Sequence, residues 1–357
     1  MKCLIVTPHR LGIREMAERV GEEWEAMGHS VEYILARGAA ARIGSITIGV
    51  PGIAVWWYRT LRNIAACHEK YDLIWTHQPI APAVPTTDEI FWNKTVATIH
   101  TTLTREYELT REGVYPKRLL PYYWLAKTAE TRFHHKLAAL NMIGPLYTVV
   151  SPHLQDEIEP LGIDQATYLP NGILTPSNQE FVPIRAEYDI PEDATVIFNI
   201  GSLTNQKRPV RFAELMRIVT NELNNTYVVM AGDGPLHETV ESYTSESLHS
   251  LGYISDEEKW RWFADADIFA SLSAYEGMPI ATAEALSFEL PVILSDIPSH
   301  RHLLEEYDAT GSLVPDDADE IVTAIKTLQS KQSAVSLMTW RAVADQYLDM
   351  IQSLDYQ

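Results

Sequence analysis

Short apolar segments rich in β-branched residues alternate with amphipathic segments along almost the whole chain of 357 residues. The segments expected to form strands are residues 3–7, 31–35, 73–76, 96–99, 148–150, 167–169, 195–200, 227–231, 268–272, 292–294 and 311–314. The segments expected to form helices between them include residues 14–27, 209–223, 256–264, 280–288 and 318–329. Strands that alternate with helices favour parallel sheets joined by right-handed crossovers. The sequence therefore predicts an α/β protein with doubly wound sheets.

The alternation is interrupted once, by a segment that contains proline and asparagine and has little periodicity (LPNGILTPSNQEFVPIR, residues 169–185). A chain of 357 residues is long enough to form two separate hydrophobic cores. We therefore expect two Rossmann-like domains that face one another, residues 1–172 and 183–337, joined by a linker at residues 173–182. Ligands of such sheets bind at the carboxyl ends of the strands, so the functional site is expected in the cleft between the domains.

The two halves of the chain differ strongly in charge. Residues 1–170 contain 17 Lys and Arg against 18 Asp and Glu, whereas residues 171–357 contain 11 against 30, so the second half carries −19 of the formal net charge of −20. A half with this charge repels a phosphate backbone, which argues against nucleic-acid binding. With 10 Lys among 28 basic residues, the acidic surface suits high salt, where repulsion between carboxylates is screened. A salt-loving source and an ordinary acidic cytosolic protein both fit this composition.

Cysteine content and hydropathy indicate the cellular compartment. The two cysteines, Cys3 and Cys67, are too few for a disulfide framework or a thiolate metal site. The N-terminal sequence MKCLIVTP leads directly into an apolar segment, without the h-region and small-residue cleavage site of a secretory signal. The longest apolar stretch, residues 46–61, contains Pro51 and Arg59 and is too short to span a membrane. We expect a soluble, cytoplasmic protein.

The strongest indication of a functional site is the segment SLSAYEGMPIATAEALSFELPVILSD, residues 271–296. A strand there ends in a polar turn with Glu276 and Gly277, and Pro279 opens a helix, where proline is favoured. Glycine lets the backbone approach a ligand closely, and the N–H groups at a helix start bind phosphate. Glu276 precedes the helix and Glu284 lies about two turns into it, so both carboxylates could accept hydrogen bonds from sugar hydroxyls. In so acidic a chain the spacing alone arises by chance in roughly one case in eight, so the prediction depends on the strand–turn–helix setting.

A second strand–turn–helix segment is NIGSLTNQKRPVRFAELMRI, residues 199–218. Lys207 and Arg208 lie at its turn, beside the start of the helix, where two cations could bind a diphosphate. The alternative is that they form an ordinary solvated helix cap. A third turn, AGDGPL at residues 231–236, has a composition that local turn formation alone explains.

In these motifs the sequence resembles, over nearly its whole length, the retaining glycosyltransferases of family four, the glycosyl transferases group 1. The matching pieces, in family order, are the loop with Gly12, Gly28-His29, DLIWTHQP (72–79), VATIHTT (96–102), YTVVSPHL (147–154), LPNGI (169–173), GSLTNQKR (201–208), AGDGP (231–235), LGYISDEE (251–258), ADADIFASLSAYEGMPIATAEAL (264–286), LPVILSD (290–296), GSLVPDD (311–317) and Trp340 in a closing helix. The resemblance implies the GT-B architecture, with an N-terminal acceptor-binding domain and a C-terminal domain for the nucleotide sugar. It also implies that a helix at about 338–357 packs back onto the first domain.

The resemblance implies catalytic roles for two residues. Glu276 would contact the transferred sugar, and His100 would lie near the reacting sugar. As a bare residue at a strand end, His100 would more often be structural. Family members generally retain the anomeric configuration and need no obligatory metal, so we expect no metal cofactor. The pairs His134-His135 and His300-x-His302 lack the spacing and the cysteine partners of a metal site, and are expected to be core or surface side chains.

The resemblance also implies how the donor, a UDP- or GDP-sugar, would bind. The residues implied for its diphosphate are Lys207, Arg208, Gly12 and the backbone of Gly277 and Met278. The ribose hydroxyls would donate hydrogen bonds to Glu284, and the base would lie near Tyr253 and Ile254.

Two positions depart from the family pattern. The phosphate motif usually has Arg after its glycine, and Ser202 stands there in this chain; the first loop has a single glycine preceded by Leu11. Because Glu276, Glu284 and Lys207 are all present, an active enzyme is the favoured interpretation. A non-catalytic partner that binds nucleotide or glycan, and a nucleotide-sugar epimerase of the same fold, are the alternatives.

Two segments of the N-terminal half suggest where the acceptor binds. Residues 46–62 (ITIGVPGIAVWWYRTLR) and 115–127 (YPKRLLPYYWLAK) mix aromatic, aliphatic and basic residues, as an interfacial membrane contact requires. The alternative is that these aromatic residues pack in the domain core. We expect a lipid-linked glycan or a glycolipid as acceptor, at the inner face of the cell membrane.

Overall fold

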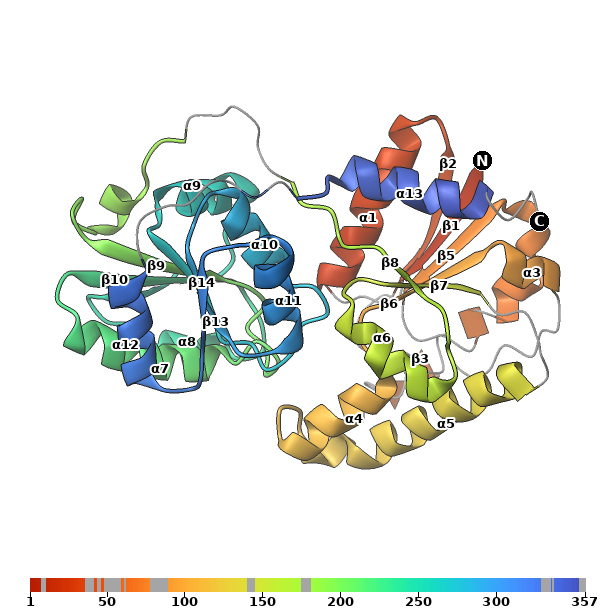
Figure 1. Cartoon of the computed structure of the whole chain (residues 1–357), viewed down its shortest axis with the longest axis horizontal. Coiled ribbons are helices and arrows are strands. Elements are labelled where there is room, and N and C mark those ends of the chain that lie inside the picture. The colour runs from red at the N-terminus through yellow and green to blue at the C-terminus, as the bar shows by residue number, and fades with distance from the viewer. Residues whose placement is uncertain are drawn as a thin grey trace. The chain divides into compact units, whose positions relative to one another are not determined.

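The structure is a computed structural model that describes residues 1–7, 11–35, 42–43, 46–47, 59–60, 62–77, 89–139, 145–174, 181–328, 335 and 337–352. Contacts between Cα atoms divide the chain into two units. Unit 1 contains Met1–Gly172 and Met338–Gln357, and unit 2 contains Ile173–Leu337. Each unit is built on a six-stranded sheet flanked by helices (Figure 1).

The sheet of unit 1 is parallel throughout and has the strand order β2-β1-β5-β6-β7-β8. Its strands are β1 (Lys2–Thr7), β2 (Ser30–Leu35), β5 (Leu73–His77), β6 (Thr95–Ile99), β7 (Leu146–Val149) and β8 (Thr167–Tyr168), and β3 (Arg42–Ile43) pairs separately with β4 (Ile46–Thr47). Its helices are α1 (Leu11–Ala26), α3 (Glu89–Asn93), α4 (Leu103–Glu112), α5 (Leu120–Ala139), α6 (His153–Ile158) and α13 (Trp340–Gln352).

The sheet of unit 2 is also parallel, with the order β11-β10-β9-β12-β13-β14. Its strands are β9 (Thr195–Ile200), β10 (Thr226–Ala231), β11 (Leu248–Ser250), β12 (Ile268–Ser271), β13 (Val292–Ser295) and β14 (Gly311–Val314). Its helices are α7 (Pro209–Glu222), α8 (His237–Glu241), α9 (Asp256–Asp265), α10 (Ile280–Ser287), α11 (Pro298–Glu306) and α12 (Ala318–Thr327). From β9 the chain adds β10 and β11 on one side of the sheet and then β12, β13 and β14 on the other. The topological switch point therefore lies between β9 and β12.

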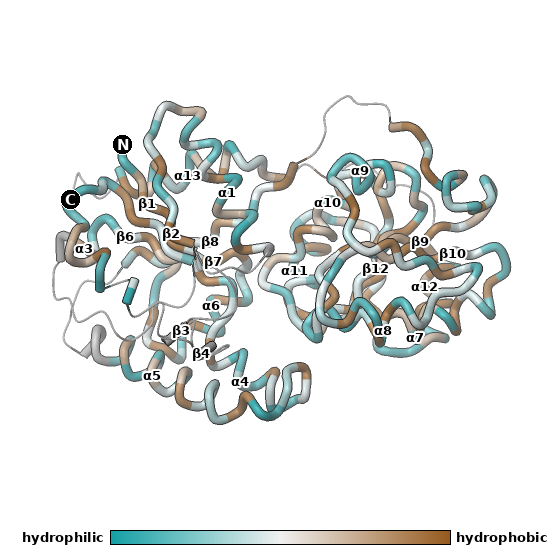
Figure 2. Tube along the Cα trace, turned by 180° about the vertical axis from the view of Figure 1, so that it is seen from behind, coloured by the Kyte–Doolittle hydropathy of each residue, from teal (hydrophilic) through white to brown (hydrophobic). Residues whose placement is uncertain are grey.

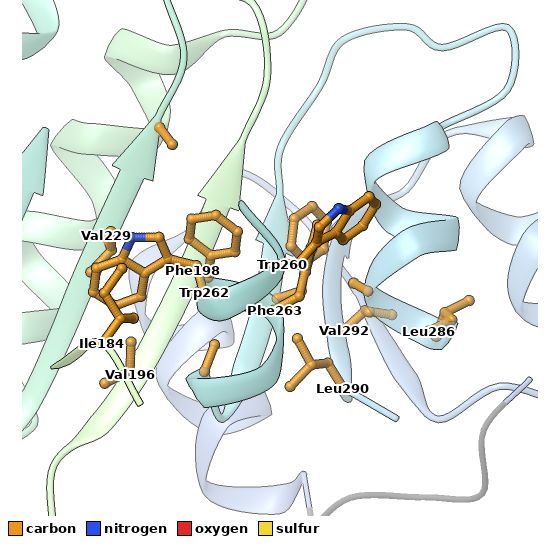
Figure 3. Close-up of a cluster of buried hydrophobic side chains, with 14 of the residues drawn as sticks. Ile184, Val196, Phe198, Val229, Trp260, Trp262, Phe263, Leu286, Leu290 and Val292 are labelled. Atoms are coloured by element: carbon orange, nitrogen blue, oxygen red, sulfur yellow. The ribbon is translucent and has the colours of Figure 1, made fainter. Parts of the chain in front are cut away.

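Period-two alternation along β9 separates the two cores of unit 2. Val196 and Phe198 point to one face, where they pack with α9, α10 and α11, and Ile197 points to the other, where it packs with α7 and α12. Figure 3 shows the first of these faces, with Phe198 stacked near Trp262 of α9 at 5.9 Å between ring centroids. Both faces are covered, as in all-parallel sheets generally, and the hydrophobic residues follow the strands in Figure 2.

The closing helix α13 belongs to unit 1 and packs against α1. The Trp24 indole of α1 donates a hydrogen bond to the carbonyl of Ala344, at 3.0 Å, and the buried Tyr347 ring packs against Trp75 of β5 at 4.6 Å between centroids, tilted by 46°. At Gly172 a Cβ atom would lie 2.5 Å from the Trp340 nitrogen, so only glycine allows the chain to pass this close to the start of α13.

Most of the expected elements are present, with small differences at the site. Gly12, expected in a loop, lies in the first turn of α1. Pro279 is the N-cap of α10, not its first residue, and Glu284 lies little more than one turn into that helix. Strand β11 was not expected, because its three residues, Leu-His-Ser, have no apolar run. Much of the expected linker at 173–182 and of the segment 46–62 lies outside the described residues.

Candidate active site

A pocket lies at the carboxyl ends of β9 and β12, at the switch point of unit 2. It is bounded by the loop that follows each strand and by the first residues of α7 and α10. The residues that line it are Asn199, Ile200, Gly201, Ser202, Leu203, Lys207, Pro209, Ser271, Ser273, Glu276, Pro279, Ala281 and Thr282. Two helix starts therefore border the same pocket, and helix starts favour bound anions.

Lys207 and Glu276 face each other in this pocket. The Lys207 ammonium donates to both carboxylate oxygens of Glu276, at 2.6 and 2.7 Å. The Glu276 side chain is 7% exposed and that of Lys207 is 32% exposed, so the cation lies on the solvent side of the pair. The structure thus brings together the two residues on which the predicted site most depended, although they are far apart in sequence.

Two hydrogen bonds, one of them from a side chain, hold the two loops of the pocket together. The Ala274 N–H donates to the carbonyl of Gln206 at 2.8 Å, and the Gln206 side-chain amide donates to the carbonyl of Tyr275 at 2.9 Å. Because Gln206 precedes Lys207 and Tyr275 precedes Glu276, these two bonds place the ion pair directly.

The AGDGP turn supports the first of these loops from behind. Gly232 has a φ of +133°, and a Cβ atom there would lie 1.9 Å from the carbonyl oxygen of Gly201. The Leu203 N–H donates to the carbonyl of Asp233 at 2.9 Å. A turn that the sequence explains by local chemistry alone is therefore a packing partner of the pocket loop, and this requires glycine at position 232.

Arg208 is directed toward another acid. It is the N-cap of α7 with a φ of 52°, and its guanidinium pairs with Asp316 on the loop after β14. Asp316 also accepts a hydrogen bond from Arg211 through its backbone carbonyl, at 3.0 Å. Ser202 lines the pocket, and Arg208 is not among its lining residues, so the diphosphate contact implied for Arg208 stays a prediction.

Glu284 has a partner that the sequence did not indicate. The Lys259 ammonium of α9 donates to Glu284 at 3.0 Å; the Glu284 side chain is buried, and that of Lys259 is 13% exposed. Lys259 also lies 3.9 Å from the centroid of the Trp260 ring. A lysine in a run of acidic residues has no spacing relationship to Glu284, so only the packing of α9 beside α10 reveals the pair.

The other residues of unit 2 that the resemblance implied for donor binding lie in two loops, one before α9 and one before α10. Tyr253 and Ile254 lie in the loop that leads into α9; the Tyr253 side chain is 83% exposed, whereas Ile254 is buried in the core. Gly277 and Met278 connect Glu276 to the N-cap of α10, and Met278 packs against the same core.

In unit 1, His100 follows β6 and contacts a histidine of the neighbouring strand. The Nδ1 atom of His77, the last residue of β5, lies 3.1 Å from the Nε2 atom of His100. His77 is fully buried, and burial, with repulsion from His100 whenever that ring is protonated, holds the pKa of His77 well below its usual range. His77 belongs to the DLIWTHQP motif, and nothing in the composition of that motif indicates a role for it.

The other histidine pairs are divided between core and surface. His134 is buried beside Tyr147, whose hydroxyl lies 3.1 Å from its Nδ1 atom, and burial lowers its pKa to about 4. His300 is buried with its Nδ1 atom 2.9 Å from the carbonyl of Ser295. Among the described residues, no cluster of three or more His, Cys, Asp or Glu side chains is arranged to hold a metal ion.

The segment 115–127 contains both core and surface aromatic residues. Tyr123 is 5% exposed, whereas Trp124 and Leu125, on the outer side of α5, are 55% and 62% exposed. Its N-terminal residues Lys117 and Arg118 are also exposed. No helix within the described ranges combines the length and the hydropathy needed to cross a membrane.

Known families and relatives match the chain in both units. The profile described as Glycosyl transferases group 1 matches residues 181–339, and that of Glycosyltransferase Family 4 matches residues 12–175. The glycosyltransferase TuaC of Bacillus subtilis, named for teichuronic acid biosynthesis, is 26% identical over 69% of this chain and 60% of its own length. The UDP-Gal:alpha-D-GlcNAc-diphosphoundecaprenol alpha-1,3-galactosyltransferase of Escherichia coli is 29% identical over 47% of this chain and 45% of its own. The chain thus matches less than two thirds of either relative.

Solved structures show the same fold over the whole of this chain. Sucrose-phosphate synthase from Thermosynechococcus elongatus has a TM-score of 0.72 with 16% sequence identity, over 100% of this chain and 99% of its own. The two profiles together cover most of both units, and each unit has the parallel Rossmann-like sheet of the GT-B fold. The chain belongs to the glycosyl transferases group 1 family and has the GT-B fold.

Proposed function

We propose that this protein is a retaining hexosyltransferase that moves a sugar from a nucleoside-diphosphate sugar to a hydroxyl group of a lipid-linked glycan or glycolipid. The observation that carries the proposal is the Lys207–Glu276 pair, held at 2.6 Å in a pocket bordered by two helix starts. A cation and helix N-termini suit a diphosphate, and a carboxylate beside them suits a sugar hydroxyl.

The donor would bind mainly to unit 2. Lys207, on the solvent side of its pair, would turn toward the diphosphate, and the N–H groups at the start of α10, next to Gly277 and Met278, would bind it from the other side. Glu284 would accept hydrogen bonds from the ribose hydroxyls beside Lys259, and Tyr253 and Ile254 would flank the base. The donor named for the E. coli relative, UDP-Gal, supports a UDP-sugar over a GDP-sugar.

Transfer would begin as the bond between the anomeric carbon and the leaving phosphate breaks. Lys207 and the helix N–H groups would stabilise the negative charge that develops on the nucleoside diphosphate, where such stabilisation contributes most to catalysis. The acceptor hydroxyl would attack from the face that the phosphate leaves, and its proton would pass to the departing phosphate oxygen. The new glycoside would keep the anomeric configuration, and Glu276 would hold a hydroxyl of the moving sugar throughout.

The acceptor would bind to unit 1, with His100 near the reacting sugar. Trp124 and Leu125 are exposed on α5, and the basic residues Lys117 and Arg118 lie just before that helix. Aromatic and basic side chains beside exposed apolar ones suit the interface of an anionic membrane. This arrangement, and the undecaprenol-linked acceptor named for the E. coli relative, support a lipid-linked acceptor at the inner face of the cell membrane.

Product analysis tests the proposal against its alternatives. The purified chain is incubated with UDP- and GDP-sugars and with membrane lipid extracts or polyprenyl-diphosphate sugars, and the products are identified by mass spectrometry and NMR. A new α-linked glycoside from an α-linked donor supports retention and transfer. An altered nucleotide sugar without a new glycoside indicates an epimerase. Binding of nucleotide without any product supports the non-catalytic alternative, which Ser202 favours.

A further inference from the structure

Two histidines of unit 1 share one hydrogen bond at the ends of neighbouring parallel strands. His77 ends β5 and His100 directly follows β6, so the strand pairing brings both imidazoles to the same edge of the sheet. Their rings are 5.4 Å apart between centroids with an interplanar angle of 24°, and the Nδ1 atom of His77 lies 3.1 Å from the Nε2 atom of His100. The Trp75 ring lies against His77 on the inner side, at 4.1 Å between centroids.

The hydrogen bond requires that one proton lie between these two nitrogen atoms. Because His77 is fully buried, its imidazole is neutral and carries its single proton on either Nδ1 or Nε2. Its Nε2 atom is buried and has no hydrogen-bond partner among the described residues. A buried N–H group without an acceptor is rarer than a buried acceptor without a donor. The proton of His77 therefore belongs on Nδ1, where it is donated to His100.

This assignment decides the tautomer of His100. Its Nε2 atom accepts the proton of His77, so a neutral His100 carries its own proton on Nδ1. We propose that His77 is a positioning residue that holds His100 in the Nδ1–H tautomer, so that His100 acts on the sugar as a hydrogen-bond donor and not as a base. The inference rests on the proposed function, in which His100 lies near the reacting sugar. Residues that fix the tautomer of a functional histidine in this way act through its second ring nitrogen.

The tautomers are measured without any substrate. Long-range 1H–15N correlation spectra of the full chain, labelled at histidine and deuterated elsewhere, distinguish protonated from unprotonated ring nitrogens. His77→Asn and His100→Asn variants assign the two rings. The expected result is a protonated Nδ1 on both His77 and His100. A proton on the Nε2 atom of His100 would overturn the inference, whatever the enzyme does.

Kinetics test whether His77 acts through His100. In His77→Leu we expect kcat to fall about 10- to 100-fold, as when a supporting hydrogen bond of a functional ligand is removed, with little change in KM. In His77→Asn the side-chain amide can still donate near the position of Nδ1, and we expect kcat within about threefold of the wild type. The matched control is His134→Leu, which also removes a buried histidine of unit 1, but one that is hydrogen-bonded to Tyr147 and not to His100.

A double-mutant cycle separates positioning from general structural damage. If His77 acts through His100, adding His77→Leu to His100→Ala causes no further loss of kcat. An equal loss in both backgrounds would make His77 a structural residue only and would overturn the inference. If His100→Ala alone leaves transfer unchanged, the proposed role of His100 is wrong, but the proposed transferase activity still stands. If the wild type transfers no sugar, the proposed function fails, and the spectra still decide the tautomer.

Discussion

The Lys207 ammonium lies 2.6 and 2.7 Å from the two carboxylate oxygens of Glu276, although the residues belong to different strand–helix connections of unit 2. Glu276 is nearly buried, so its carboxylate depends on this cation for charge compensation. A donor diphosphate would compete with Glu276 for Lys207, and the sugar hydroxyls would then supply hydrogen bonds to the carboxylate. The pair is therefore suited to exchange partners when the donor binds.

Replacing either member of this pair should abolish most of the transfer activity. Lys207→Ala removes the ammonium group that would stabilise the negative charge of the leaving diphosphate, and we expect kcat to fall about 100- to 1,000-fold. It also leaves Glu276 unpaired, which should lower the free energy of unfolding by about 1–3 kcal/mol. Glu276→Ala should cause a comparable loss of kcat. Steady-state kinetics and chemical denaturation check both effects. Lys326→Ala, at an exposed ion pair with Glu222, is the control, and normal kinetics in both site variants would contradict the assignment.

Glu284 should be required for nucleotide binding. A ligand present at 100 times its Kd stabilises a protein that binds it only when folded by about 2.7 kcal/mol, which gives a clear shift in Tm. We expect such a shift with either UDP or GDP, and we expect Glu284→Gln to reduce it strongly because the ribose loses a charged acceptor. Differential scanning calorimetry in buffered KCl measures it, with the exposed Glu305→Gln as control. Equal shifts in the two variants would argue against a ribose contact.

Glu130 should make the stability of the chain depend on pH. This carboxyl is buried, accepts a hydrogen bond from the Leu103 N–H at 3.0 Å, and has its pKa raised from 4.5 to about 8 because burial disfavours its charge. A raised pKa of an acid contributes stability that is complete below the unfolded value and is lost as pH rises toward 8.

We therefore expect Tm to fall between pH 5 and pH 8, within the interval bounded by these two pKa values. In Glu130→Gln the amide oxygen can still accept from Leu103, and the fall should be smaller. Thermal melts of both proteins across this range check the prediction. A parallel decline in the wild type and in Glu130→Gln would show that another group is responsible.

The exposed apolar residues of α5 should contribute to membrane binding. Trp124→Ser and Leu125→Ser together remove the two most exposed large apolar side chains among those described for this helix, and we expect weaker binding to vesicles that contain anionic lipid. Sedimentation with vesicles of phosphatidylglycerol and phosphatidylcholine measures the binding. Ile218→Ser, at a residue 51% exposed on α7, is the matched control. Unchanged binding in the double variant would remove this surface from the proposal.

High salt should stabilise the chain. Residues 171–357 carry a formal charge of −19, and repulsion between these carboxylates falls as the Debye length shortens to about 3 Å at 1 M salt. We expect Tm to rise from 0.1 to 1 M KCl and to change little beyond. Melts at fixed pH check this, with sucrose as a comparison that does not screen charge. A constant Tm across the KCl series would favour an ordinary acidic protein over a salt-adapted one.

The amino-acid sequence alone determined the fold class and much of the candidate site. Alternating apolar and amphipathic segments are local properties, so parallel sheets and the start of α7 at Pro209 could be predicted from them. Lys207 and Glu276 could be predicted because each lies at a strand–turn–helix connection, whose composition is also local.

Only the tertiary structure decided which side chains meet. Lys259 reaches Glu284, Arg208 pairs with Asp316, and His77 bonds to His100 because strand order and helix packing bring distant segments together. No spacing in the sequence encodes these contacts, since each joins residues from different connections of a sheet. The charge that each site presents to a ligand follows from these pairings, which is why the sequence could indicate where the site lies but not how it is balanced electrostatically.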